Sequence, residues 1–217
     1  MGISDNKLIA KNTIFLYFRM LLLMFISLYT SRVTLKILGV DDFGIYQAVG
    51  GVVTFLAFLS NALSSGTSRF ITFEMGKEQP RLDILFATVR IAHFVLGLII
   101  VIVGEIVGIW FINHKLIIPS ERLNAAIFAF HFSMITTFFQ ITQVPYNAII
   151  IAYEKMNAYA YISILEAVLK LSIVFLLNVI AFDKLKVYAV LLCVIQVSII
   201  MIYRIYCRIR FSEVKAK

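Results

Sequence analysis

The chain has 217 residues, of which 61% are hydrophobic and only 15% are charged, and its formal net charge is +8. A soluble domain has about 45–50% apolar and about 25% charged residues, so this composition leaves too little polar surface for a water-soluble globule. The mean hydropathy of +0.94 therefore indicates an integral membrane protein and excludes an ordinary soluble enzyme.

Long apolar segments, with the charges clustered between them, predict an all-α bundle of six membrane-spanning helices. In chain order the spans are expected at 13–34, 45–67, 87–112, 124–150, 159–181 and 186–206. Short connections containing Gly, Pro, Asp and Lys separate them, the first being KILGVDDFG at 36–44. Residues 1–217 are thus interpreted as one six-helix lobe, and 207–217 as the start of a cytoplasmic linker or tail.

The distribution of Lys and Arg predicts the orientation of the spans. Basic residues are more numerous on the side that holds both termini, so the positive-inside rule places both termini in the cytoplasm. The net positive charge is therefore interpreted as a topology signal, and no nucleic-acid partner is expected. The first span lacks a small-residue cleavage site and is interpreted as an uncleaved helix.

Residues 13–30 of the first span, TIFLYFRMLLLMFISLYT, contain a single charged residue, Arg19. Arginine within a span costs about 2.5–3.5 kcal/mol on insertion scales, so it needs a polar environment. Arg19 either extends toward the lipid headgroups or contacts an anion in a cavity. Asn12 and Thr30 share its helical face, which favours the cavity.

Polar residues recur at helical spacing in three further spans, giving each helix one polar face. Such faces lack partners in lipid, so they meet other helices or a water-filled cavity. Interhelical hydrogen bonds of about 0.6–2 kcal/mol each are the alternative, but four long faces favour a hydrated cavity. The faces comprise Gln47, Thr54, Asn61, Ser65 and Ser68 in the second span, Ser133, Thr136, Gln140, Gln143 and Asn147 in the fourth, and Tyr159, Ser163, Glu166 and Lys170 in the fifth.

The third span has a different pattern, with glycines on one face and the small-xxx-small motif GEIVG. This pattern predicts a helix that packs closely against a neighbour. Glu105 in the motif is either a protonation site or a neutral residue near the interface. His93 and His131 are interpreted as packing or interfacial residues.

Two local features of the fourth and fifth spans have alternative explanations. Pro145 removes a backbone hydrogen bond and should kink its helix, either for packing or because the helix lines a binding site. Glu166 and Lys170 are four residues apart with the acid first, the favourable order for a helical ion pair. The pair either neutralises itself or serves as an ion or proton site that opens when substrate competes for Lys170.

Motifs for catalysis are absent from the sequence. There is no GxxxxGK[ST], HExxH or GxSxG motif, and Cys193 and Cys207 have no ligand-type spacing. We therefore expect no enzyme activity, no catalytic residue, no cofactor and no metal site.

Three stretches resemble bacterial polysaccharide flippases of the multidrug/oligosaccharidyl-lipid/polysaccharide exporter superfamily. They are KILGVDDFGIYQAVGGVVTFLAFLSNALSSGTSRFITFEMGK, VPYNAIIIAYEKMNAYAYISILEAVLKL and YCRIRFSEVK. The resemblance implies a transporter of twelve to fourteen helices in the bacterial inner membrane, with two six-helix lobes that work by alternating access. This chain would be the N-terminal lobe and would need a second lobe or a second copy.

The resemblance also implies an O-antigen type substrate, a polyprenyl-pyrophosphate-linked oligosaccharide, and residues that contact it. Cationic residues would receive the pyrophosphate, amides would suit the sugar hydroxyls, and Glu166 is a candidate for ion or proton coupling. A multidrug or cation exporter of the same fold and a membrane scaffold of an envelope complex are the alternatives. The candidate cavity residues are Arg19, Asn61, Arg69, Gln140, Gln143, Asn147 and Lys170.

Overall fold

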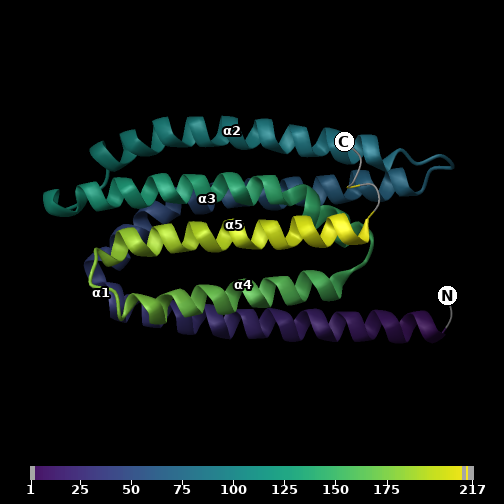
Figure 1. Ribbon diagram of the computed structural model, residues 1–217, viewed down its shortest axis with the longest axis horizontal. Coiled ribbons are helices and arrows are strands. Elements are labelled where there is room, and N and C mark those ends of the chain that lie inside the picture. The colour runs from purple at the N-terminus through teal and green to yellow at the C-terminus, as the bar shows by residue number, and fades with distance from the viewer. Residues whose placement is uncertain (1–2, 212–213, 215–217) are drawn as a thin grey trace.

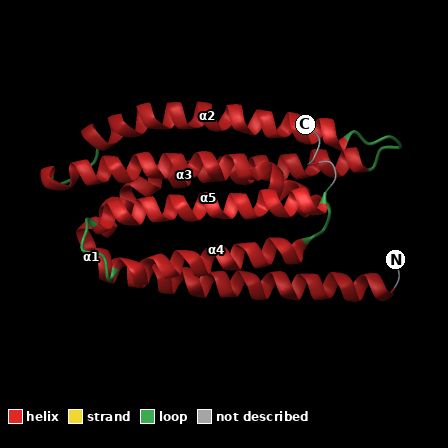
Figure 2. Ribbon diagram, viewed as in Figure 1, coloured by secondary structure: helices red, strands yellow, loops and turns green. Residues whose placement is uncertain are grey.

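The computed structural model describes residues 3–211 and 214, and the side chains of residues 13–51, 62–211 and 214. These residues form long helices joined by short loops, and no strand occurs among them (Figure 2). The all-α prediction is therefore confirmed. The helices are α1 (Ile3–Met75), α2 (Leu82–His114), α3 (Ser120–Ala152), α4 (Met156–Leu177) and α5 (Lys184–Arg210).

Helix α1 consists of two arms separated by Gly39, its one residue with non-helical dihedral angles (φ 82°, ψ 170°). Glycine adopts a positive φ without the steric cost that a Cβ would impose. The chain reverses direction at this point, so the first arm (3–38) and the second arm (40–75) run in opposite directions (Figure 1). The connection expected at 36–44 is wrong in its length, since only Gly39 departs from helical geometry.

All five helices are long enough and apolar enough to cross a membrane. The predicted spans 13–34 and 45–67 both fall within α1, one in each arm. Helices α2 and α3 begin several residues before the predicted spans 87–112 and 124–150, and α4 ends at Leu177, before the predicted limit of 181. Pro145 lies inside α3, which is helical throughout.

The bundle has two ends, which differ in the segments they contain. Gly39 and the α2–α3 and α4–α5 loops lie at one end, which we call the kink end (Figure 1). The start of α1, the α1–α2 and α3–α4 loops and the end of α5 lie at the other, which we call the termini end.

Helix α3 lies at the centre of the bundle and packs against α1, α2 and α5. Its residues Phe130, Met134 and Ile141 are fully buried. Helix α2 approaches α3 through glycines, because a Cβ at Gly108 would overlap the ring of Phe130. This close approach confirms the packing role expected for the GEIVG motif.

Candidate functional site

A polar cavity of about 390 Å³ lies between both arms of α1, α4 and α5. Its wall carries hydroxyl, amide and charged groups although the helices themselves are apolar. The polar lining residues are Ser27, Thr30, Ser31 and Thr34 from the first arm, Gln47 and Tyr46 from the second arm, Ser163, Glu166 and Lys170 from α4, and Tyr188 from α5.

A second hollow of about 270 Å³ adjoins the first and shares Gln47, Lys170 and the two tyrosines with it. It adds the α3 residues Ser133, Thr136 and Gln140 and the α5 residue Gln196. Residues from all four polar faces expected from the sequence therefore meet around these two hollows, which we treat together as the polar cavity.

The side chain of Arg19 extends from the first arm of α1 to α4, next to the polar cavity. Its Nε donates a 2.7 Å hydrogen bond to Ser163 Oγ, and its guanidinium carbon lies 4.5 Å from the centre of the Tyr159 ring. Ser163 itself lines the cavity, so Arg19 is one hydrogen bond away from it. Stacking of the planar guanidinium on an aromatic face fixes its direction toward α4.

Glu166 and Lys170 form the ion pair that their spacing predicted. Lys170 Nζ lies 2.6 Å from Glu166 Oε1, and both residues line the polar cavity. The side chain of Lys170 is 39% exposed and that of Glu166 is 24% exposed, so a ligand in the cavity can reach both. In this arrangement the charges neutralise each other along one face of α4.

Gln143 and Asn147 occupy a different place from Gln140 although they lie on the same face of α3. Gln143 is buried, accepts a 2.8 Å hydrogen bond from Gln196 Nε2 and donates a 3.3 Å bond to Asn147 Oδ1. Neither residue lines the polar cavity. Gln143 thus links α3 to α5 by the interhelical hydrogen bonding that the sequence left as an alternative, and Asn147 bonds to Gln143 within α3.

The remaining candidates are not brought to the polar cavity by the described structure. Arg69 is exposed on the second arm of α1, outside both hollows. The side chain of Asn61 lies outside the described residues. The cavity therefore gathers Gln140, Glu166 and Lys170, with Arg19 adjacent.

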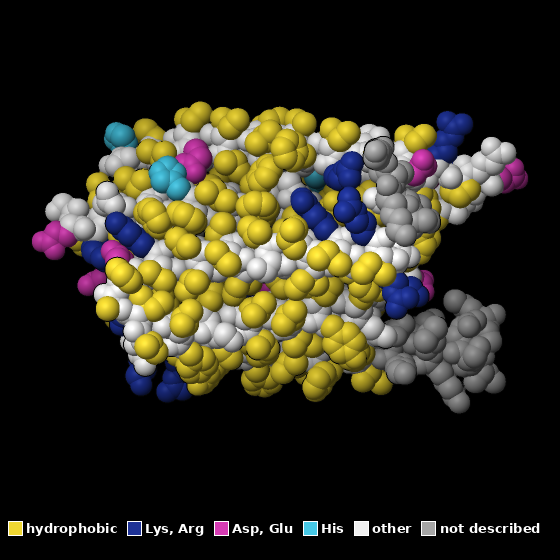
Figure 3. All heavy atoms as spheres, viewed as in Figure 1, with side chains coloured by type: hydrophobic (Ala, Val, Ile, Leu, Met, Phe, Trp, Pro, Cys, Tyr) yellow, Lys and Arg dark blue, Asp and Glu magenta, His cyan; other side chains and the backbone are white. Residues whose placement is uncertain are grey.

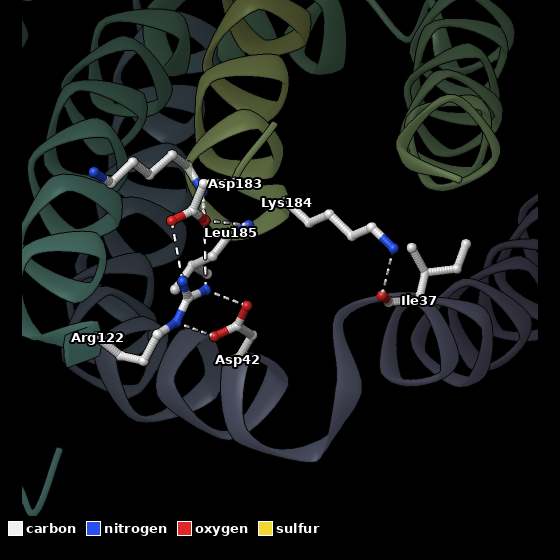
Figure 4. Close-up of polar contacts among 7 residues, drawn as sticks. Ile37, Asp42, Arg122, Asp183, Lys184 and Leu185 are labelled. Carbon is white, nitrogen blue, oxygen red and sulfur yellow. Dashed lines mark hydrogen bonds and ion pairs between the residues drawn. The ribbon is translucent and has the colours of Figure 1, made fainter. Parts of the chain in front are cut away.

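The sequence analysis missed an ion cluster at the kink end (Figure 4). Arg122 at the start of α3 donates to Asp42 through Nε at 2.7 Å and through Nη2, and to Asp183 through Nη1 at 3.0 Å. Asp183 also accepts from the N–H groups of Leu185 (3.1 Å) and Lys186 (3.4 Å), which caps α5. The cluster joins α1, α3 and α5 where each begins or bends.

No local signal points to this cluster, because the partners of Arg122 are 80 and 61 residues away. A second contact that the sequence did not predict joins α2 and α3, where His131 Nδ1 lies 2.8 Å from Glu105 Oε2. Within the described ranges, no group of His, Cys, Asp and Glu side chains is arranged to hold a metal ion.

No family model, curated protein or solved structure matches this chain. The resemblance to polysaccharide flippases therefore stays a prediction from the sequence.

Proposed function

We propose that the chain is one lobe of a transporter that flips a polyprenyl-pyrophosphate-linked oligosaccharide across the bacterial inner membrane by alternating access. The observation that supports this most is the polar cavity, where Lys170 and a set of hydroxyl and amide groups face one another inside an apolar bundle. Polar groups at membrane depth are expensive, so a cavity lined by several helices favours a transport pathway.

The proposed lobe has six spans, with each arm of α1 counted as one. Because the chain reverses at Gly39, Ile3 and the end of α5 lie at the same end of the bundle (Figure 1). A second lobe in the same orientation would have to begin on that side of the membrane. Lys and Arg are more numerous at the termini end than at the kink end, so the positive-inside rule favours a cytoplasmic location for the termini end.

The chemistry of the cavity suits an anion with a sugar attached. A diphosphate in a low-dielectric passage needs cationic partners, and an arginine fork binds phosphate oxygens in pairs. Among the described residues, Arg19 uses only Nε in a hydrogen bond, which leaves its two Nη groups available for a ligand. Gln47 and Gln140 present amides that suit sugar hydroxyls.

Glu166 gives the site a means of coupling. Its carboxylate holds Lys170 in an ion pair, so a pyrophosphate that binds Lys170 has to displace Glu166. An ion or proton bound at Glu166 would favour that exchange, which makes Glu166 the candidate for coupling.

Glu166 also supports a second candidate function, the export of a lipophilic cation. A carboxylate in the cavity wall would pair with such a substrate once Lys170 turned away. This candidate predicts that substrate affinity falls when Glu166 is neutralised and rises when Lys170 is neutralised, the reverse of the first proposal.

Binding measurements on the purified chain in nanodiscs separate these functions. We expect a short-chain prenyl-pyrophosphate disaccharide to bind the wild type, and to bind Lys170→Met and Arg19→Ala at least about tenfold more weakly, which corresponds to ~1.4 kcal/mol. Ser198→Ala, on an exposed part of α5, is the matched control. Equal affinity of all four proteins would reject the anion proposal, and tight binding of ethidium that depends on Glu166 would favour the cation exporter.

A further inference from the structure

A groove of about 620 Å³ lies on the outer face of the bundle at the termini end, separate from the polar cavity. Arg90 from α2 and Arg204 and Arg208 from α5 line it, and we call it the arginine groove. Figure 3 shows Lys and Arg side chains gathered on this face near the end of α5, surrounded by hydrophobic side chains. The arginine groove shares no lining residue with the polar cavity.

Three helices and the buried Val214, which follows α5, form the groove. Helices α2 and α5 each pack against α3, and within the described chain they do not approach each other. The buried α3 residues Thr142 and Tyr146 form the floor between them. The guanidinium of Arg204 lies 5.6 Å from the centre of the Tyr146 ring, which positions its charge over the floor.

The walls of the groove are apolar and open. Ile91 and Phe94 on α2 are 61% and 50% exposed, and Met201 and Ile205 on α5 are 52% and 57% exposed. A ligand that fits this groove therefore combines a negatively charged group near the arginines with an apolar chain along the walls. Free phosphate satisfies only the first requirement.

The arginines carry an excess of positive charge that the described structure leaves without acidic partners. Among the residues whose side chains are described, no carboxylate forms an ion pair with Arg90, Arg204 or Arg208. Arg204 and Arg208 are four residues apart on one helix, and like charges at this spacing repel each other. An anion placed between the three guanidinium groups would relieve that repulsion and accept paired hydrogen bonds.

We propose that the arginine groove binds an anionic membrane phospholipid, with the phosphate between Arg90, Arg204 and Arg208 and an acyl chain against Phe94 and Met201. Basic pockets between helices on the cytoplasmic side of a membrane are suited to anionic headgroups, and the groove lies at the end of the bundle that the basic residues assign to the cytoplasm. The lipid bridges α2 and α5, which the protein itself leaves apart at this end. This inference does not depend on the proposed transport function.

Native mass spectrometry of the purified full chain tests the proposal. The protein is mixed with equal amounts of phosphatidylglycerol, cardiolipin and phosphatidylcholine, and the lipids retained after detergent removal are counted. We expect the wild type to retain the anionic lipids, and the triple variant R90Q/R204Q/R208Q to retain them at least about tenfold less, because several basic side chains add their attraction at an anionic lipid.

The matched control is the variant K77Q/R81Q/K155Q, which also removes three positive charges at the termini end but at positions outside the arginine groove. It should retain anionic lipid as the wild type does. Equal loss in both triple variants would show that only the general surface charge attracts lipid, and equal retention of phosphatidylcholine by the wild type would also overturn the proposal. Added inorganic phosphate should not displace the lipid, and displacement by phosphate alone would identify a phosphate site instead.

A second measurement keeps all three arginines and therefore does not depend on the folding of a triple variant. Trp110 is the one tryptophan of the chain, so the variant W110F/F94W carries a single tryptophan in the groove wall. Phosphatidylglycerol with brominated acyl chains should quench its fluorescence more strongly than brominated phosphatidylcholine at the same mole fraction. Equal quenching by the two lipids would contradict the proposal.

Discussion

Two sets of arginines at opposite ends of the bundle have opposite surroundings. At the kink end, Arg122 is enclosed by Asp42 and Asp183 and joins three helices. At the termini end, Arg90, Arg204 and Arg208 surround an open groove without a described acidic partner. The difference shows that a count of basic residues along the chain predicts orientation but not role. Arg122 joins helices at one end, whereas Arg90, Arg204 and Arg208 line a groove that is open to a ligand at the other.

The largest effect on stability is expected from Arg122→Ala. The substitution removes charge-assisted hydrogen bonds to two carboxylates, each typically ~1.5–3 kcal/mol, and leaves Asp42 and Asp183 facing each other. We expect the free energy of unfolding in detergent to fall by about 2–3 kcal/mol, measured by thermal or denaturant unfolding followed by circular dichroism. Arg208→Ala, measured without added anionic lipid, should change it by less than ~0.5 kcal/mol. A larger loss for Arg208 than for Arg122 would reverse the comparison between the ends.

Two substitutions of Asp183 separate its two roles. Asp183→Asn keeps a side-chain acceptor for the N-terminal N–H groups of α5 but loses the charge that faces Arg122. Asp183→Ala loses both, so it should be less stable than the Asn variant by about 1 kcal/mol, the usual value of an N-cap. The same unfolding measurement checks this, and equal stability of the two variants would show that capping contributes little here.

A stabilising change is expected in the α3–α4 loop at the termini end. Glu154 has a positive φ of 55°, and it follows α3 at the position where helices usually end in glycine. The N–H groups of Glu154 and Lys155 donate to Ile151 (2.9 Å) and Ile150 (3.0 Å), so the left-handed turn is formed despite the side chain. Glu154→Gly should raise the unfolding free energy by up to ~1 kcal/mol. Lys155→Gly serves as the control and should not stabilise the protein.

The smallest effect concerns the α1–α2 turn, where Lys77 and Glu74 form an ion pair. Hydrogen bonds from Lys77 Nζ (2.6 Å) and from the Arg81 N–H (3.1 Å) hold the pKa of Glu74 below its ordinary value. The lowered pKa of Glu74 stabilises the turn at pH values above the ordinary carboxyl pKa of ~4.3. This contribution is lost as the pH falls below that value and through the lowered pKa. Hydrogen exchange of residues 74–82 should therefore accelerate at acid pH in the wild type, after correction for intrinsic rates. The acceleration should be absent in Glu74→Gln.

Much of the helical architecture could be predicted because lipid imposes it. An apolar run longer than about 18 residues has few alternatives to a helix, and small residues on one face predict close packing. The bend in α1 was less predictable. The letters KILGVDDFG resemble an ordinary loop, whereas a single glycine with positive φ reverses the chain and leaves its neighbours helical.

For the candidate site, the sequence predicted only which helices carry a polar face and which residues lie on it. Periodicity places Gln140 and Gln143 on the same side of α3, but the neighbouring helix decides what each one does. Gln140 lines the polar cavity, whereas Gln143 accepts a hydrogen bond from Gln196. A lone glutamine in the apolar span 186–206 was the one available signal for that bond. The partners of Arg122 come from distant parts of the chain, so no spacing rule could assign them.

Cysteine accessibility in open membrane vesicles tests most directly whether the polar faces enclose a hydrated cavity. With the buried Cys193 and Cys207 replaced by alanine, single cysteines are placed at Ser31 and Gln140 in the cavity wall and at Phe18 and Gln143 outside it. We predict that a membrane-impermeant maleimide labels the cysteines at 31 and 140 and leaves those at 18 and 143 unlabelled. If positions 31 and 140 remain as unreactive as position 18, the cavity is dry and the transport proposal is wrong.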